Sequence, residues 1–316
     1  MRYFELCQSS SEARAAAKIK VSQSAPVFRE PLMLRLRRWM LGSAYALVPK
    51  RIGLLPRLLF LSVAHLIAPE AERERLPEQP TYYSKRGLVG ISNDLAVGSL
   101  LENYKRGYFP VSHLGAMKWW CPEERAVIDP ADTHVGRQLR QHRFRLSFDE
   151  DFASVMEACA QKRPGKVPLT WITPRIMEAY WDAHQAGHAH SVEVWDENDK
   201  LVGGLYGLAI GKVFFGESQF SAWEHMSKVA LVGLHRHLAA WGYPLRDGKW
   251  MTPHLASFGF RAMPREEFQA LLNQYINEPG RIGRWSVDPT LDLADWPARA
   301  KAPLLGKAPP ALLQMA

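Results

Sequence analysis

Apolar residues in the middle of the chain follow a strand-like pattern that predicts a hairpin. Two β-rich runs, residues 201–210 and 213–220, flank the short break Gly211-Lys212, which favours a tight turn. Glycines interrupt both runs, and a glycine inside a strand typically marks a bulge or the close approach of another backbone or a ligand. We therefore expect one face of this hairpin to leave space for a ligand or another segment of backbone.

Helical periodicity and capping signals surround the hairpin. Helices are expected over residues 94–106, 133–142, 149 or 150 to 160, 174–186, 223–241, 253–257 and 264–275, and further strands over residues 191–195 and 243–251. From residue 146 the predicted order is helix, helix, strand, strand, strand, helix, strand, short helix, helix. This order indicates an α/β (α+β) fold with a mixed parallel and antiparallel sheet and helices on both faces, as in an acyltransferase of the GNAT type.

The first 80 residues have a different character. Residues 31–69 contain no acid, and their arginines and lysines are set among leucines and aromatic residues, with the longest apolar run, 58–68, too short to span a bilayer. Such a basic amphipathic segment could lie on an anionic membrane, contact a nucleic-acid backbone or pack as two helices on the main body. Residues 70–80 predict a polar linker, and the chain after Pro279 is expected to fray.

Composition narrows the class of protein and of partner. With 316 residues, 47% of them hydrophobic and 23% charged, the chain can bury a full core and has room for two domains. A net charge of +8 favours a polyanionic partner. Three widely spaced cysteines, Cys7, Cys121 and Cys159, argue for a reducing compartment, and the first residues lack a secretory pattern. We expect a cytoplasmic protein, peripheral at the membrane if residues 31–69 bind lipid.

The first candidate functional residue is Glu217, an acid in a predicted strand whose other residues are typical of a protein core. The alternative is that Glu217 caps or pairs with the following helix. His184, His188 and His190 form a cluster, but no acid or thiol is placed to complete a metal site, so structural roles are favoured.

A basic helix face and an aromatic stretch near residues 108–128 could contact a nucleic acid. The face carries Arg137, Arg140 and Arg143, and the stretch carries Arg125 among closely spaced aromatic residues. Solvated charge and ordinary core packing are the alternatives.

Seven motifs taken in order resemble one known family. The motifs DLAVGSLLENYKRGYFP, WWCPEERAVI, TWIT, GHAHSVEVW, LVGGLYGLAIGKVFFGESQFS, SKVAL and HLASFG run in register from about residue 87 to 275. Together they resemble the leucyl/phenylalanyl-tRNA–protein transferase family, although no single motif would be specific. The resemblance implies a small N-terminal family domain over 81–145 and a GNAT-like domain over 146–279. Residues 1–80, a basic extension and linker, and the Pro/Ala-rich tail 280–316 lie outside these two domains.

The resemblance also implies an activity. The family transfers leucine or phenylalanine from its charged tRNA to the α-amino group of a protein that begins with Arg or Lys, which marks that protein for degradation. The reaction is aminolysis of an ester, so an amine must lose a proton and an oxyanion must be stabilised. The resemblance implies no metal and no coenzyme A, and we expect a monomer.

Site residues carry over position by position from this resemblance. Glu217 matches the family's acid at the donor and acceptor site, and Asp247 matches its catalytic aspartate. The expected substrate contacts are an aminoacyl side-chain pocket of Leu205, Phe214 and Phe220 with Ser218 beside it, and Tyr104 and Trp120 near the terminal adenosine. The expected tRNA contacts are Lys105, Arg125, Arg137, Arg140 and Arg143.

The chain departs from the family pattern at its proposed base. The family's Asp-Cys-Gln is Asp247-Gly248-Lys249 here, and a protonated lysine has three donors and no acceptor, so it cannot replace a glutamine carbonyl. Lys249 could act as a base only if burial lowered its pKa well below about 10.4, and the nearby Asp247 would oppose that change.

Three further departures point to altered substrate contacts. Val111 replaces a tryptophan, Ser92-Asn93 replaces paired glycines, and Thr252-Pro253 replaces Asn-Asp. We interpret them as remodelled acceptor and adenosine contacts. A transferase with a small amine or lipid acceptor, and a tRNA- or membrane-binding descendant without catalysis, are the alternatives. An acetyl-coenzyme A transferase is disfavoured because residues 218–228 contain no glycine that could open a phosphate-binding turn.

Overall fold

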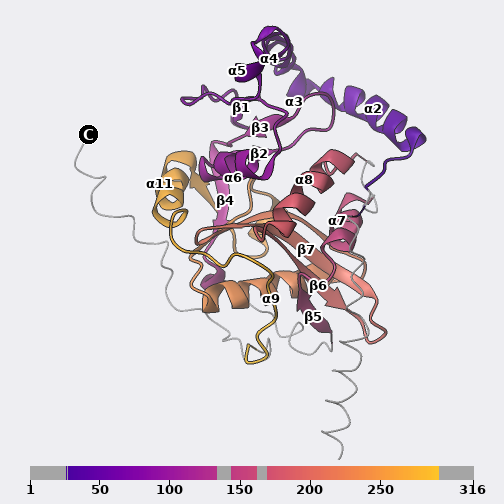
Figure 1. Ribbon diagram of the computed structural model, residues 1–316, viewed down its shortest axis with the longest axis vertical. Coiled ribbons are helices and arrows are strands. Elements are labelled where there is room, and N and C mark those ends of the chain that lie inside the picture. The colour runs from indigo at the N-terminus through magenta and orange to yellow at the C-terminus, as the bar shows by residue number, and fades with distance from the viewer. Residues whose placement is uncertain (1–25, 27, 134–143, 162–168, 292–316) are drawn as a thin grey trace, which may run out of the picture.

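A seven-stranded mixed sheet forms the centre of the computed structural model, which describes residues 26, 28–133, 144–161 and 169–291 (Figure 1). The strand order is β10–β4–β9–β8–β7–β6–β5; β8 and β9 pair in parallel, and the other neighbours pair antiparallel. The bounds are β4 (Glu124–Ile128), β5 (Arg145–Phe148), β6 (Ala189–Trp195), β7 (Leu201–Ile210), β8 (Val213–Ser221), β9 (Leu245–Asp247) and β10 (Arg261–Pro264). The predicted mixed sheet is confirmed.

The predicted hairpin is β7 and β8, and it contains the predicted bulge. Tyr206 pairs with Ser218 whereas Gly207 pairs with Gly216, so Glu217 is the additional residue on β8. The expected room above the hairpin is occupied. A Cβ on Gly203 would lie 2.4 Å from the Met226 Cβ, and one on Gly207 would lie 2.6 Å from the ring of Phe214. The glycines therefore allow close packing and do not leave a vacant space.

Helices cover both faces of the large sheet (Figure 1). α7 (Phe152–Ala160) and α8 (Pro174–Gln185) lie on one face and α9 (Met226–Ala240) on the other. Asp151 caps α7 by accepting from the backbone N–H of Ser154, so the expected cap at Asp149 or Glu150 was wrong by one or two positions. α9 begins three residues later than predicted. A helix was expected over residues 133–142. Apart from Thr133, these residues lie outside the described ranges.

The strand predicted over residues 243–251 is much shorter, because the backbone leaves the extended region at Lys249, whose φ is +67°. α10 (Pro253–Ala256), the glycine turn at Gly259 and α11 (Arg265–Tyr275) follow as predicted. Strands β5 and β10 lie at the two edges of the sheet and were not predicted.

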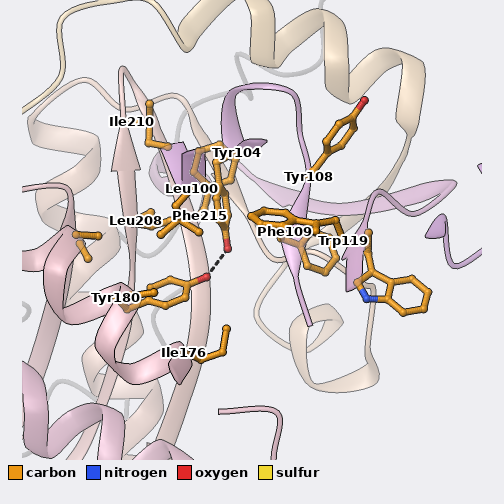
Figure 2. Packing of buried hydrophobic residues seen from close by; sticks show 14 of the residues in the cluster. Leu100, Tyr104, Tyr108, Phe109, Trp119, Ile176, Tyr180, Leu208, Ile210 and Phe215 are labelled. Carbon is orange, nitrogen blue, oxygen red and sulfur yellow. Dashed lines mark hydrogen bonds between the residues drawn. The ribbon is translucent and has the colours of Figure 1, made fainter. Parts of the chain in front are cut away.

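A three-stranded sheet with the order β1–β3–β2 lies over the α8 face (Figure 1). It consists of β1 (Leu88–Ile91), β2 (Phe109–Pro110) and β3 (Lys118–Trp120), with α6 (Val97–Lys105) before β2. The chain then enters the large sheet through β4, before the short 3₁₀ helix η1 (Pro130–Asp132). One apolar cluster joins the two sheets: Leu100, Tyr104 and Phe109 from the small unit pack with Tyr180 and Phe215 from the large one (Figure 2).

An N-terminal layer, residues 31–73, lies on the small sheet at the end of the molecule far from the large sheet (Figure 1). It contains α2 (Leu32–Ala46), α3 (Pro49–Ile52), α4 (Leu55–Ile67) and α5 (Glu70–Arg73). Residues 70–80, expected as a linker, are docked rather than free, because Leu76 is buried against Gly90. None of the helices in the described ranges has both the length and the apolar character needed to cross a membrane.

The chain beyond Pro279 packs onto the large sheet as far as Leu291, so the expected fraying was wrong for these residues. Trp285 is buried and stacks on His190 with 3.7 Å between ring centroids. Its backbone N–H donates to the carboxylate of Asp149 at 2.7 Å. One aromatic side chain therefore anchors the end of the described chain; residues 292–316 lie outside it.

Candidate functional site

A buried ion pair joins the two carried-over positions Glu217 and Lys249. The Lys249 ammonium donates to Glu217 Oε2, and the two side chains are 7% and 0% exposed for Lys249 and Glu217, respectively. Tyr104 donates its hydroxyl to Glu217 Oε1 at 2.5 Å, and the Tyr104 and Tyr180 hydroxyl oxygens are 2.6 Å apart (Figure 2). We call Glu217 and Lys249 the site pair.

Local structure explains how these groups meet. Alternation along β8 puts Glu217 on the side of Phe215, toward α6 and α8. Tyr104 follows Leu100 by one helical turn on the buried stripe of α6, and Tyr180 lies on the buried stripe of α8. Two helices and a bulged strand thus bring three polar groups to one point.

A second buried ion pair supports the first. Arg125 on β4 binds Asp247 on β9 through two hydrogen bonds of 2.7 Å, and both side chains are fully buried. A third nitrogen of Arg125 donates to the Gly107 carbonyl oxygen at 2.8 Å. Asp247 also accepts from the backbone N–H of Lys249 at 2.8 Å. This last bond fixes the backbone that carries Lys249.

This arrangement corrects the expected role of Arg125. All three guanidinium nitrogens already have partners inside the protein, and the side chain has no exposed surface. A buried, fully bonded arginine is not available to a tRNA phosphate. Arg125 therefore belongs to the interior of the site and not to a tRNA-binding surface.

Burial shifts both members of the site pair toward their neutral forms. Desolvation raises the pKa of Glu217, and the Lys249 charge and hydrogen bonds oppose this change. Desolvation lowers the pKa of Lys249, and the Glu217 carboxylate opposes this first, with Asp247 a lesser contributor. Burial also raises the pKa of Tyr104 well above its ordinary value. The pKa of Lys249 is therefore shifted downward, which is the direction that a base requires.

Aromatic rings surround the Lys249 ammonium. Its nitrogen lies 5.0 Å from the ring centre of Phe109, 5.4 Å from that of Trp171 and 5.7 Å from that of Tyr104. Phe109 and Tyr104 are fully buried, whereas Trp171 is half-buried. The site pair is therefore nearest to solvent on the side of Trp171.

The expected aminoacyl pocket does not form from the residues assigned to it. Leu205 and Phe214 are buried in the cluster that packs on α9, whereas Phe220 packs on the opposite face, near Val155 of α7. Phe214 and Phe220 are six residues apart on β8, so strict alternation would put them on one face; the additional residue of the bulge puts them on opposite faces. Ser218 follows Glu217 at the bulge, where it pairs with Tyr206.

The expected adenosine contacts are also enclosed in this structure. Tyr104 is fully buried and bonded to Glu217, as described above. Trp120 is 6% exposed, and its indole N–H donates to the Val111 carbonyl oxygen at 2.8 Å. Neither residue presents an open ring face for a base to stack on.

Among the expected tRNA contacts, Lys105 is at the surface, where it pairs with Glu102 at 2.6 Å. Arg137, Arg140 and Arg143 lie outside the described residues. A surface hollow of about 350 Å³ is found away from the site pair, between α2 and the start of α8. Arg35, Arg38 and Arg175 contribute to its lining, so it is basic.

The histidine cluster has structural partners. His184 Nδ1 lies 2.8 Å from the Ala189 carbonyl oxygen, and the ring stacks on Phe152. His190 Nδ1 lies 2.9 Å from Asp149 Oδ2. In the part of the chain that the structure describes, no group of three or more His, Cys, Asp or Glu side chains is arranged to hold a metal ion.

One departure from the family pattern, Ser92-Asn93, contacts α4 of the N-terminal layer and Glu74, which follows the layer in the sequence. The Glu74 carboxylate accepts from the backbone N–H groups of Asn93 and Asp94 and from the Ser92 hydroxyl. The Asn93 amide nitrogen lies 3.0 Å from His65 Nε2 of α4. Ser92 and Asn93 therefore bind the N-terminal residues of the chain. Their interpretation as remodelled substrate contacts stays a prediction.

The other departures have local roles. The Thr252 hydroxyl caps α10 by accepting from the Leu255 N–H at 3.1 Å, and Pro253 is the first residue of that helix. Val111 is half-buried against the core, and its carbonyl accepts from Trp120.

Sequence reasoning missed Tyr180, Trp171 and the Arg125–Asp247 pair. Tyr180 carried a usable signal, since it lies on the apolar stripe of α8 with Ile176 and Ala183. Trp171 lies in the motif TWIT, which was recognised without a role being given to its tryptophan. The ion pair had no sequence signal, because its members are 122 residues apart.

Comparison with known proteins yields one family. The sequence model described as leucyl/phenylalanyl-tRNA protein transferase matches residues 127–273. A leucyl/phenylalanyl-tRNA–protein transferase of Pseudomonas syringae pv. syringae (strain B728a) is 43% identical over 228 residues, which cover 71% of this chain and 93% of that protein. The corresponding protein of Azotobacter vinelandii (strain DJ / ATCC BAA-1303) is 44% identical over 208 residues, or 64% and 91% of the two chains.

A solved structure shows a weaker similarity. A functionally unknown conserved protein from Staphylococcus epidermidis ATCC 12228 has a TM-score of 0.32 and 12% sequence identity, over 56% of this chain and 68% of that chain.

Proposed function

The chain belongs to the leucyl/phenylalanyl-tRNA–protein transferase family, and from this membership we propose that it transfers leucine or phenylalanine from a charged tRNA to the α-amino group of a protein beginning with Arg or Lys. The product would be marked for degradation. One structural observation supports the proposal most: Glu217 and Asp247, 30 residues apart in the sequence, are both bonded to Lys249.

The proposed reaction is aminolysis of the aminoacyl ester. The acceptor's ammonium group gives up a proton, and the free amine attacks the ester carbonyl carbon. A C–N bond forms, the C–O bond to the terminal ribose breaks, the attacking nitrogen loses its second proton, and the ribose oxygen leaves with a proton, so that one proton is released overall. Because the ester is already activated, holding the amine and the carbonyl in contact supplies much of the rate.

We assign Lys249 the proton transfers. In its neutral form, which burial favours, it accepts the proton of the acceptor amine and later returns a proton to the ribose oxygen. Glu217 stabilises the positive charge, first on the arriving ammonium group and then on protonated Lys249. Asp247 is fully buried, and its carboxylate accepts from Arg125 and from the backbone N–H of Lys249, so we propose that it positions Lys249. This role replaces direct catalysis by Asp247.

A transfer assay tests the function. Purified protein is incubated with tRNA charged with radiolabelled leucine or phenylalanine and with a peptide that begins with Arg or Lys. We expect label in the peptide and none in a matched peptide that begins with Ala. Absence of transfer at every pH would reject the proposal.

Replacing the lysine separates an enzyme from a binder. Lys249→Gln restores the residue of the family pattern, whose amide carbonyl can accept a hydrogen bond. Transfer that increases supports a remodelled enzyme whose base is not Lys249, and transfer that falls supports Lys249 as the base. Transfer that stays absent in both proteins, with tRNA binding retained, supports a descendant that only binds tRNA.

A second candidate function differs in the acceptor. The N-terminal layer contacts Asn93 directly, so a small amine or an amino lipid could replace the protein N-terminus as the acceptor. Offering both classes of amine in the transfer assay distinguishes them. Label in lipid or amine and none in peptide would favour this candidate.

The remaining proposals concern architecture and location. We propose that the large sheet is a GNAT-like acyltransferase unit, supported by the parallel pair β8 and β9 with α9 as their connection, and that the small sheet is a separate family domain. We also propose a cytoplasmic monomer. Light scattering of the purified protein tests the oligomeric state.

A further inference from the structure

Exposed apolar side chains are concentrated on the N-terminal layer. In the described part of the chain, all the large apolar side chains classed as exposed lie between Leu32 and Ile67, apart from Trp223 and Ile282. Five of those in the layer are more than two thirds exposed: Leu32, Met33, Met40, Leu66 and Ile67. A concentration of this kind marks an interaction surface.

The apolar stripe of α4 points away from the protein. Leu59, Phe60, Val63, Leu66 and Ile67 recur at three- and four-residue spacing, so they share one face, and all five are exposed. The opposite face is docked.

That docked face of α4 holds the helix to the small sheet. Arg57 lies over the ring of Tyr83 at 3.8 Å, Leu58 and Leu61 pack on the core, and His65 contacts Asn93. The orientation of the exposed stripe is therefore fixed by the docked face.

α2 repeats this arrangement. Its docked face carries Arg38, which binds Glu30 and the His113 carbonyl oxygen, and Gly42, whose Cβ position would lie 2.5 Å from Leu114. Tyr45 contacts the ring of His113 on the same side. At about 100° per residue, the opposite face is an apolar stripe. That stripe consists of Leu32, Met33, Leu36, Trp39, Met40 and Leu47, all exposed.

Basic residues flank the stripe of α2. On α2, Arg35 and Arg37 lie about 100° to either side of the stripe centre, and both are exposed. Residues 31–69 contain no acid, and Lys50 and Arg51 stand between the two helices in the sequence. An apolar stripe bordered by arginines is typical of a helix that lies in the interface of an anionic bilayer.

We propose that α2 and α4 dock the protein on an anionic lipid bilayer, with their apolar stripes in the acyl boundary and the arginines at the phosphate groups. α4, with 13 residues, is about 20 Å long, so a bilayer of roughly 30 Å hydrocarbon thickness would meet it along its side. The layer occupies the end of the molecule opposite the large sheet, so the docked protein keeps that sheet away from the lipid (Figure 1). The inference does not depend on the proposed transfer activity.

Vesicle sedimentation tests the docking. The full chain is mixed with phosphatidylcholine vesicles or with vesicles that also contain phosphatidylglycerol. We expect binding to the anionic vesicles only, weakened about tenfold when monovalent salt is raised toward 1 M. No binding to anionic vesicles, or equal binding to both compositions, would overturn the proposal.

Two double variants make the test specific. Leu59→Glu/Phe60→Glu changes the stripe, and Trp223→Glu/Ile282→Glu makes the same change at the exposed apolar side chains elsewhere. We expect the stripe variant to bind anionic vesicles at least about tenfold more weakly and the control to bind like the wild type. Equal binding by both variants would overturn the proposal.

Two alternative occupants have their own signatures. If the wild type is a dimer without lipid and the stripe variant is a monomer by light scattering, the stripes belong to a second copy of the chain. If the stripe variant loses tRNA binding in a filter assay, they belong to a nucleic-acid site. Either result would overturn docking on lipid; a monomer with unchanged tRNA binding supports it.

Discussion

Most proteins bury apolar side chains and expose charged ones. The site pair buries charged side chains, and the N-terminal layer exposes apolar ones. Around Glu217 the protein encloses two acids and two bases among aromatic rings, whereas in the layer it leaves Leu59 and Met40 facing outward. Burying ions costs free energy unless they are paired, and exposing apolar stripes gains nothing for a monomer in water. Neither region is explained by folding alone, so each indicates a binding or chemical role.

The comparison also shows how each region is stabilised. The ions depend on one another across long sequence distances, so changes there should affect the whole fold. The side chains of the apolar stripes are exposed to solvent, so changes there should affect binding and leave the stability of the fold unchanged. The following predictions test this difference, from the largest expected effect to the smallest.

Removing the buried arginine should have the largest effect on stability. Arg125→Met leaves Asp247 without its cation in a fully buried position, and we expect the free energy of unfolding to fall by about 3–5 kcal/mol in denaturant titration. Arg145→Met, which breaks surface ion pairs with Glu150 and Asp199, is the control, with an expected loss below about 1 kcal/mol. Similar losses in the two variants would show that the buried pair is not special.

Removing the buried lysine should affect chemistry as well as stability, because Glu217 also loses its buried partner. Lys249→Met should lower the transfer rate by about 10²- to 10⁴-fold, because the acceptor amine loses its proton acceptor. Lys200→Met, at an exposed turn, should stay within about twofold of the wild type. The wild-type rate should also rise with pH over a window below 10.5, since burial lowers the pKa of Lys249 and the neutral form is the active one. Full activity of Lys249→Met would exclude Lys249 as the base.

A third buried acid gives a pH-dependent stability. Glu193 accepts from Ser147 Oγ at 2.6 Å inside the sheet, and burial raises its pKa from 4.5 to about 7. The folded protein then binds more protons than the unfolded chain between pH 4.5 and 7. Its contribution to stability is therefore complete below pH 4.5 and is lost as the pH rises through 7, by about 3 kcal/mol.

Comparing variants isolates this contribution. Glu193→Gln should remove that part of the decline in unfolding free energy between pH 4.5 and 7, measured by denaturant titration at each pH. Glu197→Gln, at an exposed turn, should leave the pH dependence unchanged. If the decline in Glu193→Gln equals that of the wild type, another group causes it.

The smallest effect is expected on the exposed stripe. Leu59→Glu/Phe60→Glu should change the free energy of unfolding by less than about 0.5 kcal/mol, because both side chains are already in water. Leu58→Glu/Leu61→Glu, on the docked face of the same helix, should destabilise α4 by about 2 kcal/mol. Hydrogen exchange of the α4 amides measures both. Equal protection in the two variants would mean that the stripes are not oriented as described.

Local features of the fold could be predicted because they depend on near neighbours. The turn at Gly211, the bulge beside Gly207 and the helix start at Pro174 each have short-range sequence signals. The edge strands β5 and β10 carry weak signals, because each has only one neighbouring strand and a part-exposed face. The buried anchor Trp285 was missed because a single aromatic residue in a proline-rich stretch has no periodicity.

The sequence by itself determined the hairpin, most helices and the family, since all of these depend on local order along the chain. Only the tertiary structure decided that Asp247 binds Arg125, that Glu217 binds Lys249, and that Leu205 and Phe220 lie on opposite faces of the sheet. Periodicity shows that α2 and α4 have an apolar face but not which way it points. That direction depends on the docked faces, whose partners at His113 and Asn93 lie far along the chain.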